Sequence, residues 1–260
     1  MPIKDELGDR IKAFEAVETA RILDRAAFTV FRVDGRAFSS FTRGMDRPYD
    51  ARLAEAMIAA AKALIVEFDA PFAFTQSDEI TLILPPRSGL SELPFGGKAF
   101  KLTSIAAGVA TAAFAPHAIR NWPEKGVPSF DARVFSVPTA DDAGDALVWR
   151  MRDAYRNAVS MAAQSLFSHK KLQNVSVRGM LQMMRDEKAV DFDAAYPARF
   201  RRGVLLRRVV RERLLDAVEL ARIPERYRPT GPVPRTLIDE EPITSEGAVR
   251  DLLFPERVAA

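Results

Sequence analysis

Residues 73–84 read AFTQSDEITLIL, a polar tetrapeptide between two apolar segments. The flanking residues are β-branched, aromatic and aliphatic, so the stretch predicts two buried strands joined at residues 76–79. The joining residues include two adjacent carboxylates, Asp78 and Glu79, and contain no Gly, Pro or Asn. A turn selected only for its geometry more often contains Gly or Asn. The carboxylates therefore need a chemical explanation as well as a structural one.

Composition limits the class of protein. The chain has 260 residues, of which 48% are hydrophobic and 28% charged, as expected for a soluble globular protein of one large or two modest domains. No run approaches the roughly 18 uninterrupted apolar residues of a membrane span. The first ten residues, MPIKDELGDR, contain no apolar signal region. We therefore expect a cytoplasmic protein with no membrane partner.

Cysteine and histidine are scarce. The absence of cysteine excludes disulfides, thiolate catalysis and cysteine-bound zinc. The two histidines, His117 and His169, make a histidine-based metal site improbable on numbers alone. Any metal is then expected to be a hard cation held by oxygen atoms.

The pattern along the chain predicts an α+β domain. We expect helices at residues 9–24, at 51–68 after an Asp50 N-cap, from Lys98, from 145 to about 167, and within 168–187. We expect strands at 26–35, within 73–84, at 126–138 and at 203–210, a loop at 85–97, and a mostly irregular Pro-rich tail at 224–242. This order predicts helices packed against a mainly antiparallel sheet.

Two acidic strings stand at strand ends, Asp34-Gly35 after the first strand and Asp78-Glu79 in the hairpin. If these strands are neighbours, the carboxylates converge and raise one another's pKa, which favours a divalent cation between them. Two Mg²⁺ ions at such a site would align a hydroxyl with a phosphorus atom. Each string alone is also explained as an ordinary polar turn.

A set of strings in order resembles a known family. FRVDGRAFSSF, RPYDARLAEAM and QSDEITLIL, followed by KAFKLTSIAAGVATAAF, FDARVFSVP and DALVWRMRDAYRN, resemble the tRNA-histidine guanylyltransferase superfamily of 3′-to-5′ polymerases. The resemblance covers residues 10–205. It implies a polymerase/cyclase-like palm with two Mg²⁺ ions over residues 1–205, and leaves residues 206–260 as a C-terminal extension packed on the same domain.

The resemblance assigns roles by position. Asp34 and Asp78 match the metal-binding carboxylates, Gly35 matches a ligand through its carbonyl oxygen, and Glu79 matches the adjacent acid of the catalytic set. The positions matched to nucleotide binding are Arg47, which replaces a lysine of the family, Asp50, Ser77, Lys98 and Lys101. The lysines stand three residues apart at a helix start, where cations and the helix N-terminus both favour phosphate.

The long helix departs from the family pattern. Members that recognise the histidine tRNA carry HINNLYN where this chain has YRNAVSM at 155–161, so that only Asn157 is retained. This difference, together with FSHKKLQ, resembles the bacterial and archaeal guanylyltransferase-like proteins, which repair truncated tRNA 5′ ends. The candidate RNA contacts are Arg150, Arg152, Arg156, Asn157, His169, Lys170 and Lys171. The last three are more readily explained as a solvated helix boundary.

The implied function is Mg²⁺-dependent addition of nucleotides to a tRNA 5′ end, with ATP and GTP as substrates and a homo-oligomer, by family analogy a tetramer. RFRRGVLLRRVVRER at 199–213 holds seven arginines, which suits an RNA partner or a solvated strand and helix. Two alternatives stay open. One is a palm-domain nucleotide cyclase that needs no RNA, and the other is a noncatalytic RNA-binding protein.

Overall fold

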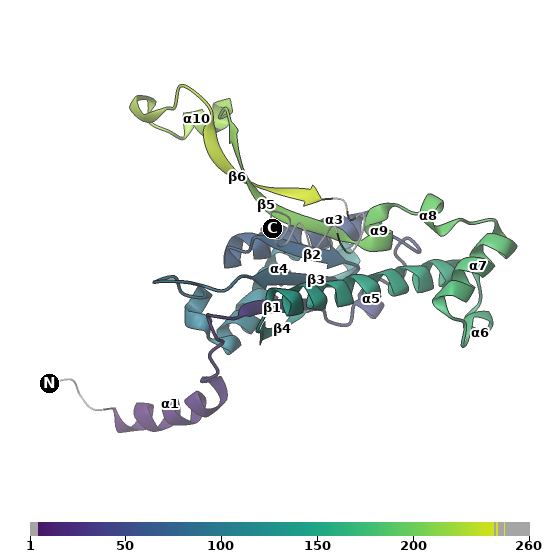
Figure 1. Cartoon of the computed structure of the whole chain (residues 1–260), viewed down its shortest axis with the longest axis horizontal. Coiled ribbons are helices and arrows are strands. Elements are labelled where there is room, and N and C mark those ends of the chain that lie inside the picture. The colour runs from purple at the N-terminus through teal and green to yellow at the C-terminus, as the bar shows by residue number, and fades with distance from the viewer. Residues whose placement is uncertain (1–4, 242, 244–246, 248–260) are drawn as a thin grey trace.

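The computed structural model describes residues 5–241, 243 and 247, and its centre is a six-stranded sheet in the order β4-β1-β3-β2-β5-β6 (Figure 1). The strands are β1 (Phe28–Gly35), β2 (Phe72–Gln76), β3 (Glu79–Leu84), β4 (Phe130–Val137), β5 (Val204–Arg213) and β6 (Val233–Glu241). All five pairings between neighbouring strands are antiparallel. The predicted α+β class with an antiparallel sheet is confirmed.

Three long helices cover the sheet. α3 (Ala51–Phe68) and α4 (Ala99–Asn121) pack on one face, where they enclose Phe31 and Val33 of β1. α5 (Ala140–Leu166) packs on the other face against Val30. Since side chains of a strand alternate between faces, Arg32 and Asp34 lie on the α5 face with Val30. The short elements are α2 (Phe38–Phe41), η1 (Pro94–Gly97), η2 (Pro123–Lys125), α6 (His169–Leu172), α7 (Val177–Lys188), α8 (Phe192–Ala195), α9 (Ala198–Arg202), α10 (Ala217–Ala221) and η3 (Glu225–Tyr227).

The start of α5 and the presence of β6 differ from the sequence prediction. α5 begins at Ala140, five residues before the predicted start at Asp145, because Thr139 caps it by accepting a hydrogen bond from the Asp142 N–H. The tail predicted to be irregular contains β6, a nine-residue strand. β6 forms because β5 offers it a complete row of backbone partners, a long-range pairing that local composition does not record.

The β5–β6 hairpin continues beyond the sheet as an arm, with α10 near its tip (Figure 1). The base of β5 belongs to the sheet, since residues 204–207 pair with β2. A division of the chain between residues 205 and 206 therefore falls within β5. The chain crosses from sheet to arm without a break in the strand.

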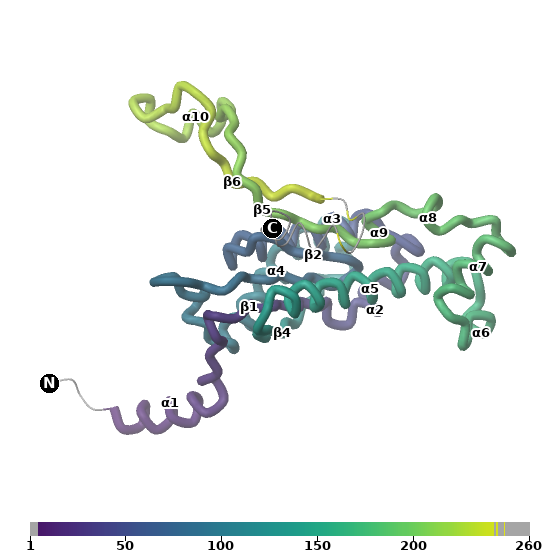
Figure 2. Tube along the Cα trace, viewed as in Figure 1, coloured from purple at the N-terminus to yellow at the C-terminus, as the bar shows by residue number. Residues whose placement is uncertain are grey.

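The first helix, α1 (Glu6–Thr19), lies apart from the sheet (Figure 2). It confirms a helix at the N-terminal end, but it ends before residue 24 and none of its residues is buried. α4 is the one helix of the described residues that is long and apolar enough, by length and composition alone, to cross a membrane. Its buried side packs on α3 and β4 as in the core of a folded domain.

Candidate active site at the end of the central hairpin

The hairpin turn between β2 and β3 consists of Ser77 and Asp78. Ser77 has φ 54°, in the left-handed region that non-glycine residues rarely adopt and that often marks a functional site. The turn is tied to the end of β1, because the Gly35 N–H donates a hydrogen bond to the Asp78 carbonyl oxygen at 3.0 Å. Asp34 is paired with Glu79 in the β1–β3 register. The strand order thus brings both acidic strings to one end of the sheet.

The electrostatics of this end are those of crowded carboxylates. The pKa of Asp34 is raised from 3.8 to about 6. Burial is the largest cause, and the negative charge of Asp78 is the next. Burial also raises the pKa of Asp78, although the Ser77 hydroxyl donates to its Oδ1 at 3.0 Å and acts in the opposite direction. Asp131, which lies across from Asp34 on β4, adds a further negative charge that the sequence did not single out. A cation would relieve this repulsion.

Glu79 is arranged differently from its two acidic neighbours. Its carboxylate is ion-paired with Arg150 of α5 and with Arg32 of β1, the latter at 3.3 Å. The Trp149 ring lies 5.2 Å from the Arg32 guanidinium and 4.7 Å from that of Arg150. Glu79 is therefore charge-compensated by a cluster that joins the hairpin to α5.

The ion pair with Glu79 places Arg150 in the interior, whereas the sequence prediction made it an RNA contact. The side chain is only 5% exposed and also bonds Asp153 at 3.0 Å, so it lies beneath the surface and not on an RNA-facing surface. Sequence reasoning missed the role of both arginines. The available signal was weak: Arg32 shares a strand face with Asp34, and Arg150 stands three residues before Asp153.

Gly35 is required by packing. A Cβ atom at this position would stand 2.3 Å from Cδ2 of the Phe38 ring, much closer than any normal contact. Phe38 is buried among Phe114 and Phe130 and has little freedom to move. The glycine therefore lets the chain after Asp34 turn tightly over an aromatic cluster.

A cavity of about 380 Å³ adjoins the hairpin turn and is bordered by four of the predicted residues, Arg47, Asp50, Ser77 and Asp78. Gln164 and Ser165 of α5 form part of the opposite wall. Polar and charged side chains from three separate segments thus face one space beside the acidic turn. This cavity is the candidate substrate site.

Asp50 borders the 380 Å³ cavity and also caps a helix. It caps α3 by accepting from the Arg52 N–H at 2.9 Å, and it accepts from the Arg52 guanidinium at 2.7 Å. Burial would raise the pKa of Asp50, but these hydrogen bonds outweigh burial and hold that pKa below 3.8. Asp50 therefore stays ionised at neutral pH while it fixes the start of α3.

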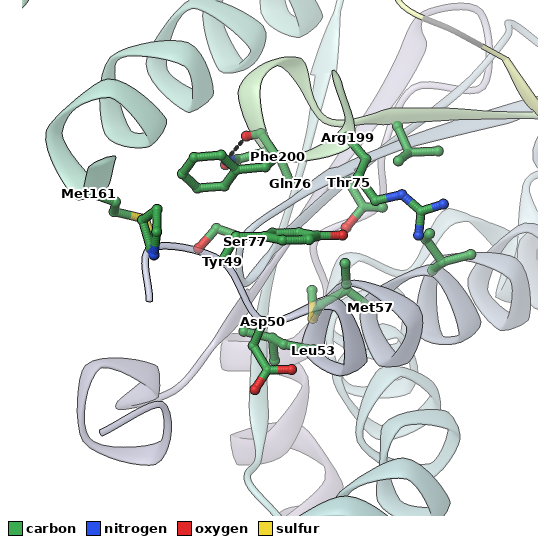
Figure 3. A pocket seen from close by; sticks show the side chains of 14 residues that line it. Tyr49, Asp50, Leu53, Met57, Thr75, Gln76, Ser77, Met161, Arg199 and Phe200 are labelled. Atoms are coloured by element: carbon green, nitrogen blue, oxygen red, sulfur yellow. Dashed lines mark hydrogen bonds between the residues drawn. The ribbon is translucent and has the colours of Figure 1, made fainter. Parts of the chain in front are cut away.

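A smaller cavity of about 50 Å³ shares Asp50, Leu53 and Ser77 with the first. Figure 3 shows the Tyr49 ring at its centre, with Phe200 on one side and Met57 on the other, and Arg199 near the Tyr49 hydroxyl. The Gln76 amide donates to the Phe200 carbonyl oxygen at 3.0 Å and holds α9 over this pocket. At about 50 Å³ this pocket is far below the roughly 300 Å³ of a typical ligand site, so Tyr49, Phe200 and Met57 serve mainly to pack α9 against α3.

The other predicted residues lie elsewhere. Lys98 and Lys101 are exposed at the start of α4, on the opposite face of the sheet from Asp34, and they border neither cavity. Arg152 and Arg156 border a separate hollow of about 400 Å³ together with Tyr155 and Arg202. Asn157, His169, Lys170 and Lys171 are exposed on or after α5, and Lys171 is ion-paired with Glu187.

The seven arginines of residues 199–213 are mostly engaged within the chain. Six of them form ion pairs: Arg199 with Glu55, Arg201 with Asp193, Arg207 with Glu241, Arg208 with Asp69, Arg211 with Asp239 and Arg213 with Glu219. Arg202 is the exception within the described part of the chain, and its guanidinium lies 5.6 Å from the Tyr155 ring. The segment is therefore a weaker anion-binding surface than its composition suggests.

The carboxylates fit a metal that needs few protein ligands. Among the described residues there is no group of three or more His, Cys, Asp or Glu suited to holding a metal ion. Mg²⁺ commonly takes one or two carboxylates and completes its shell with water and substrate phosphates. The crowded, partly buried pair of Asp34 and Asp78 matches that donor set.

Comparison with known proteins gives a consistent result. The family model described as tRNAHis guanylyltransferase matches residues 8–138. An uncharacterized protein of Acanthamoeba polyphaga mimivirus is 33% identical over 208 residues, which cover 71% of each chain. The "Probable tRNA(His) guanylyltransferase" of Drosophila melanogaster is 29% identical, over 76% of this chain and 72% of its own.

Solved structures agree with the palm-like fold that the sequence predicted. A bacterial tRNA(His) guanylyltransferase-like protein in complex with ATP is 30% identical, with a TM-score of 0.74, and the alignment covers 78% of this chain and 88% of that one. The tRNA(His) guanylyltransferase of Saccharomyces cerevisiae, at 24% identity and a TM-score of 0.62 over 74% and 91% of the two chains, supports the fold alone. With its acidic hairpin at the end of an antiparallel sheet and a family match over half its length, the chain belongs to the tRNAHis guanylyltransferase family.

Proposed function

We propose that this protein is a nucleotidyltransferase that adds nucleotides to the 5′ end of tRNA in the 3′-to-5′ direction. The observation that carries the proposal is the meeting of Asp34 and Asp78 at one sheet end, beside a cavity of about 380 Å³. Family membership supplies the reaction class. ATP and GTP are the proposed nucleotide substrates, since a relative 30% identical to this chain binds ATP.

Asp34 and Asp78, with the carbonyl oxygen of Gly35, are the residues that would hold Mg²⁺, in two ions by family analogy. Support comes from the raised pKa of both aspartates, because a cation stabilises carboxylates that repel one another. When bound, the ions would neutralise phosphate charge and assist in-line attack on phosphorus.

The side chains of the cavity would orient the substrates. Arg47 offers a cation for a triphosphate, Ser77 holds Asp78, and the arginine-paired Glu79 fixes the hairpin against α5. Lys98 and Lys101 stay triphosphate contacts only by family analogy, since neither lysine borders the two cavities. Correct placement of the reacting oxygen and phosphorus accounts for much of the rate of such reactions.

The proposed reaction has two steps. A 5′-monophosphate oxygen attacks the α-phosphorus of ATP, which forms an adenylylated 5′ end and releases pyrophosphate. The 3′-hydroxyl of the incoming nucleotide then attacks the 5′ phosphorus, which forms the new phosphodiester and releases AMP. A 5′-triphosphate end needs no activation and releases pyrophosphate in the second step.

We further propose repair of truncated tRNA over strict recognition of the histidine tRNA, because YRNAVSM replaces the family's HINNLYN. Arg152, Arg156 and Asn157 are the proposed RNA contacts on α5, with His169, Lys170 and Lys171 beyond it. A homo-oligomer, by family analogy a tetramer, and cytoplasmic residence belong to the same proposal.

The test uses the purified protein with Mg²⁺, four nucleoside triphosphates and a tRNA that lacks its first 5′ nucleotide. Products are resolved on a sequencing gel. Template-directed 5′ extension is expected for the native chain and for Asp186→Ala, an exposed carboxylate on α7, and no extension is expected for Asp78→Ala.

Two outcomes count against the proposal. Extension that persists in Asp78→Ala would remove the acidic hairpin from catalysis. RNA binding without extension by the native chain would favour a noncatalytic binding protein. A parallel reaction with truncated tRNAHis separates general repair from histidine-tRNA specificity, since repair predicts comparable extension of both tRNAs.

A further inference from the structure

Trp149 of α5 is a large aromatic side chain that lies half in solvent. It is 52% exposed, whereas Trp122, the other tryptophan of the chain, is 4% exposed. Tryptophan side chains bury a large apolar area and are common where a protein meets a partner. The reaction proposed above leaves Trp149 without a role, although it stands next to Arg150, which holds the acidic hairpin.

Two arginines hold the indole ring in place. The guanidinium carbons of Arg32 and Arg150 lie 5.2 Å and 4.7 Å from the centre of the Trp149 ring. The side chains of Arg32 and Arg150 are only 20% and 5% exposed. Since the tryptophan is much more exposed than either arginine, both arginines lie on the protein side of the ring. The outer part of the ring is open to solvent.

The positive charges beneath the ring are already compensated. Glu79 is ion-paired with Arg32 at 3.3 Å and with Arg150, and Asp153 pairs with Arg150 at 3.0 Å. These four side chains contribute two positive and two negative charges, so they offer little net charge to a phosphate group. The exposed ring itself is the binding feature of this surface, and it suits a flat group that stacks.

The Trp149 ring lies beside the acidic end of the sheet. Arg32, which it contacts, stands two residues before Asp34 on the same face of β1. Glu79, the partner of Arg32, follows Asp78 directly in sequence. One layer of side chains therefore joins the ring to the site where the proposed reaction takes place, and a group stacked on the ring would be held next to that site.

We infer that Trp149 is a stacking platform for a nucleobase of the substrate, an inference that rests on the proposed nucleotidyl transfer. Stacking on an aromatic side chain tolerates any sequence, because every base has a π-face. That tolerance suits an enzyme that adds whichever nucleotide the template requires. Two substrates bring a base to this end of the sheet, the 5′ nucleotide of the RNA and the free nucleoside triphosphate.

Tryptophan fluorescence tests the contact without turnover. Trp122→Phe leaves Trp149 as the one indole of the chain. The buried Trp122 Nε1 has no hydrogen-bond partner among the described residues, so this change removes no such bond. Truncated tRNA and GTP are titrated separately into the variant. Stacking is expected to quench the fluorescence, and the probe that quenches shows which substrate supplies the base.

Each probe has a counterpart that carries the charge without the base. A truncated tRNA with an abasic 5′ nucleotide replaces the first probe, and inorganic triphosphate replaces GTP. Filter binding and calorimetry, respectively, measure the affinities independently of fluorescence. Both counterparts are expected to bind with little quenching, because quenching requires a base in contact with the ring.

Substitution of Trp149 separates stacking from packing. Trp149→Leu keeps an apolar side chain over the two arginines but has no ring, and it should weaken binding of the quenching probe by about fivefold or more. Trp149→Phe keeps a ring and should retain most of the affinity. Neither variant should alter the affinity for the probe without the base, since a packing defect would weaken both probes equally.

Several outcomes would overturn the inference. Equal quenching by probes with and without a base would do so, as would an equal loss of affinity for the two in Trp149→Leu. Binding without quenching would also overturn it, and 5′ extension by the same protein would leave the proposed function standing. Base-dependent quenching by a chain that extends no tRNA would contradict the proposed function alone. If neither probe binds, both proposals fail.

Discussion

Asp34, Asp78 and Glu79 are three carboxylates at one sheet end, yet their surroundings differ. Asp34 and Asp78 are partly buried and have raised pKa values, whereas two arginines compensate the charge of Glu79. In the proposed reaction the first two would face the metal ions. Glu79 would instead fix the hairpin that carries Asp78, because Arg150 anchors it to α5.

Removal of Arg150 tests that anchor. Arg150→Ala is expected to lower the free energy of unfolding by about 2–3 kcal/mol, because loss of one partner from a largely buried ion pair leaves the other charge uncompensated. Arg156→Ala is the matched control, since its pair with Asp153 is exposed and should cost less than about 1 kcal/mol. Urea denaturation measures both. Equal losses in the two variants would contradict the anchoring role.

Asp34 gives a pH dependence of known sign. Its pKa is about 6 in the folded chain against an ordinary 3.8, so between these values the folded state binds the proton more tightly than the unfolded state. In metal-free buffer the Asp34 contribution to stability therefore increases as pH falls from above 6 towards 4. Asp34→Asn should melt at a higher temperature than the native chain at pH 7.5, and the difference should shrink by pH 5. A difference that is constant across this range would contradict the raised pKa.

At the scale of elements, Asp50 joins the start of α3 to the wall of the candidate substrate cavity. Asp50→Ala should destabilise the chain by about 1 kcal/mol, because it removes the N-cap hydrogen bond. Asp50→Asn keeps a capping oxygen and should restore most of that stability. Chemical denaturation measures the cap, and nucleotide titration measures the charge. Nucleotide affinity that is normal in Asp50→Asn would limit Asp50 to a structural role.

The helix boundaries show which structural features neighbouring residues alone determine. α3 begins and ends as the sequence predicts, since its cap and its apolar face are both encoded within residues 50–68. α5 extends five residues earlier than predicted because the acidic, Gly-containing segment after Thr139 obscures the apolar pattern. Thr139 is itself a favoured N-cap residue type, so a signal for the earlier start lies in the sequence.

For the molecule as a whole, ion pairs within the chain neutralise most of the positive charge of residues 199–213. Four of the paired arginines are matched by acids at least 28 positions away in sequence. Arg202 is left beside Tyr155 and near Arg152 and Arg156. Most of this basic segment therefore stabilises the fold. The hollow at Arg202 is the part that remains suited to phosphate.

Arg202→Ala is accordingly expected to weaken tRNA binding and to reduce the slope of log affinity against log salt concentration by about 1. Arg207→Ala, in the ion pair with Glu241, should leave that slope unchanged. Filter binding over a range of KCl concentrations measures both variants. Identical slopes for Arg202→Ala and the native chain would exclude a phosphate contact at this residue.

The sequence by itself determined the α+β class, the central hairpin, α3 and the positions of Asp34 and Asp78 at strand ends. These features depend on side-chain alternation, helix capping and turn chemistry, all of which act over a few neighbouring residues. The resemblance of ordered strings then placed the chain in its family, and the comparisons confirmed that assignment.

Only the tertiary structure decided the partners of Glu79, the engagement of the arginines in 199–213, the existence of β6 and the isolation of α1. Each of these depends on contacts between residues far apart in sequence. A charged side chain has the same local pattern whether it meets water, an acid or a phosphate, and a strand of mixed composition forms when a neighbour pairs with its backbone. The fold supplies those neighbours, so the chemistry at the end of the sheet depends on how α5 and the hairpin pack together.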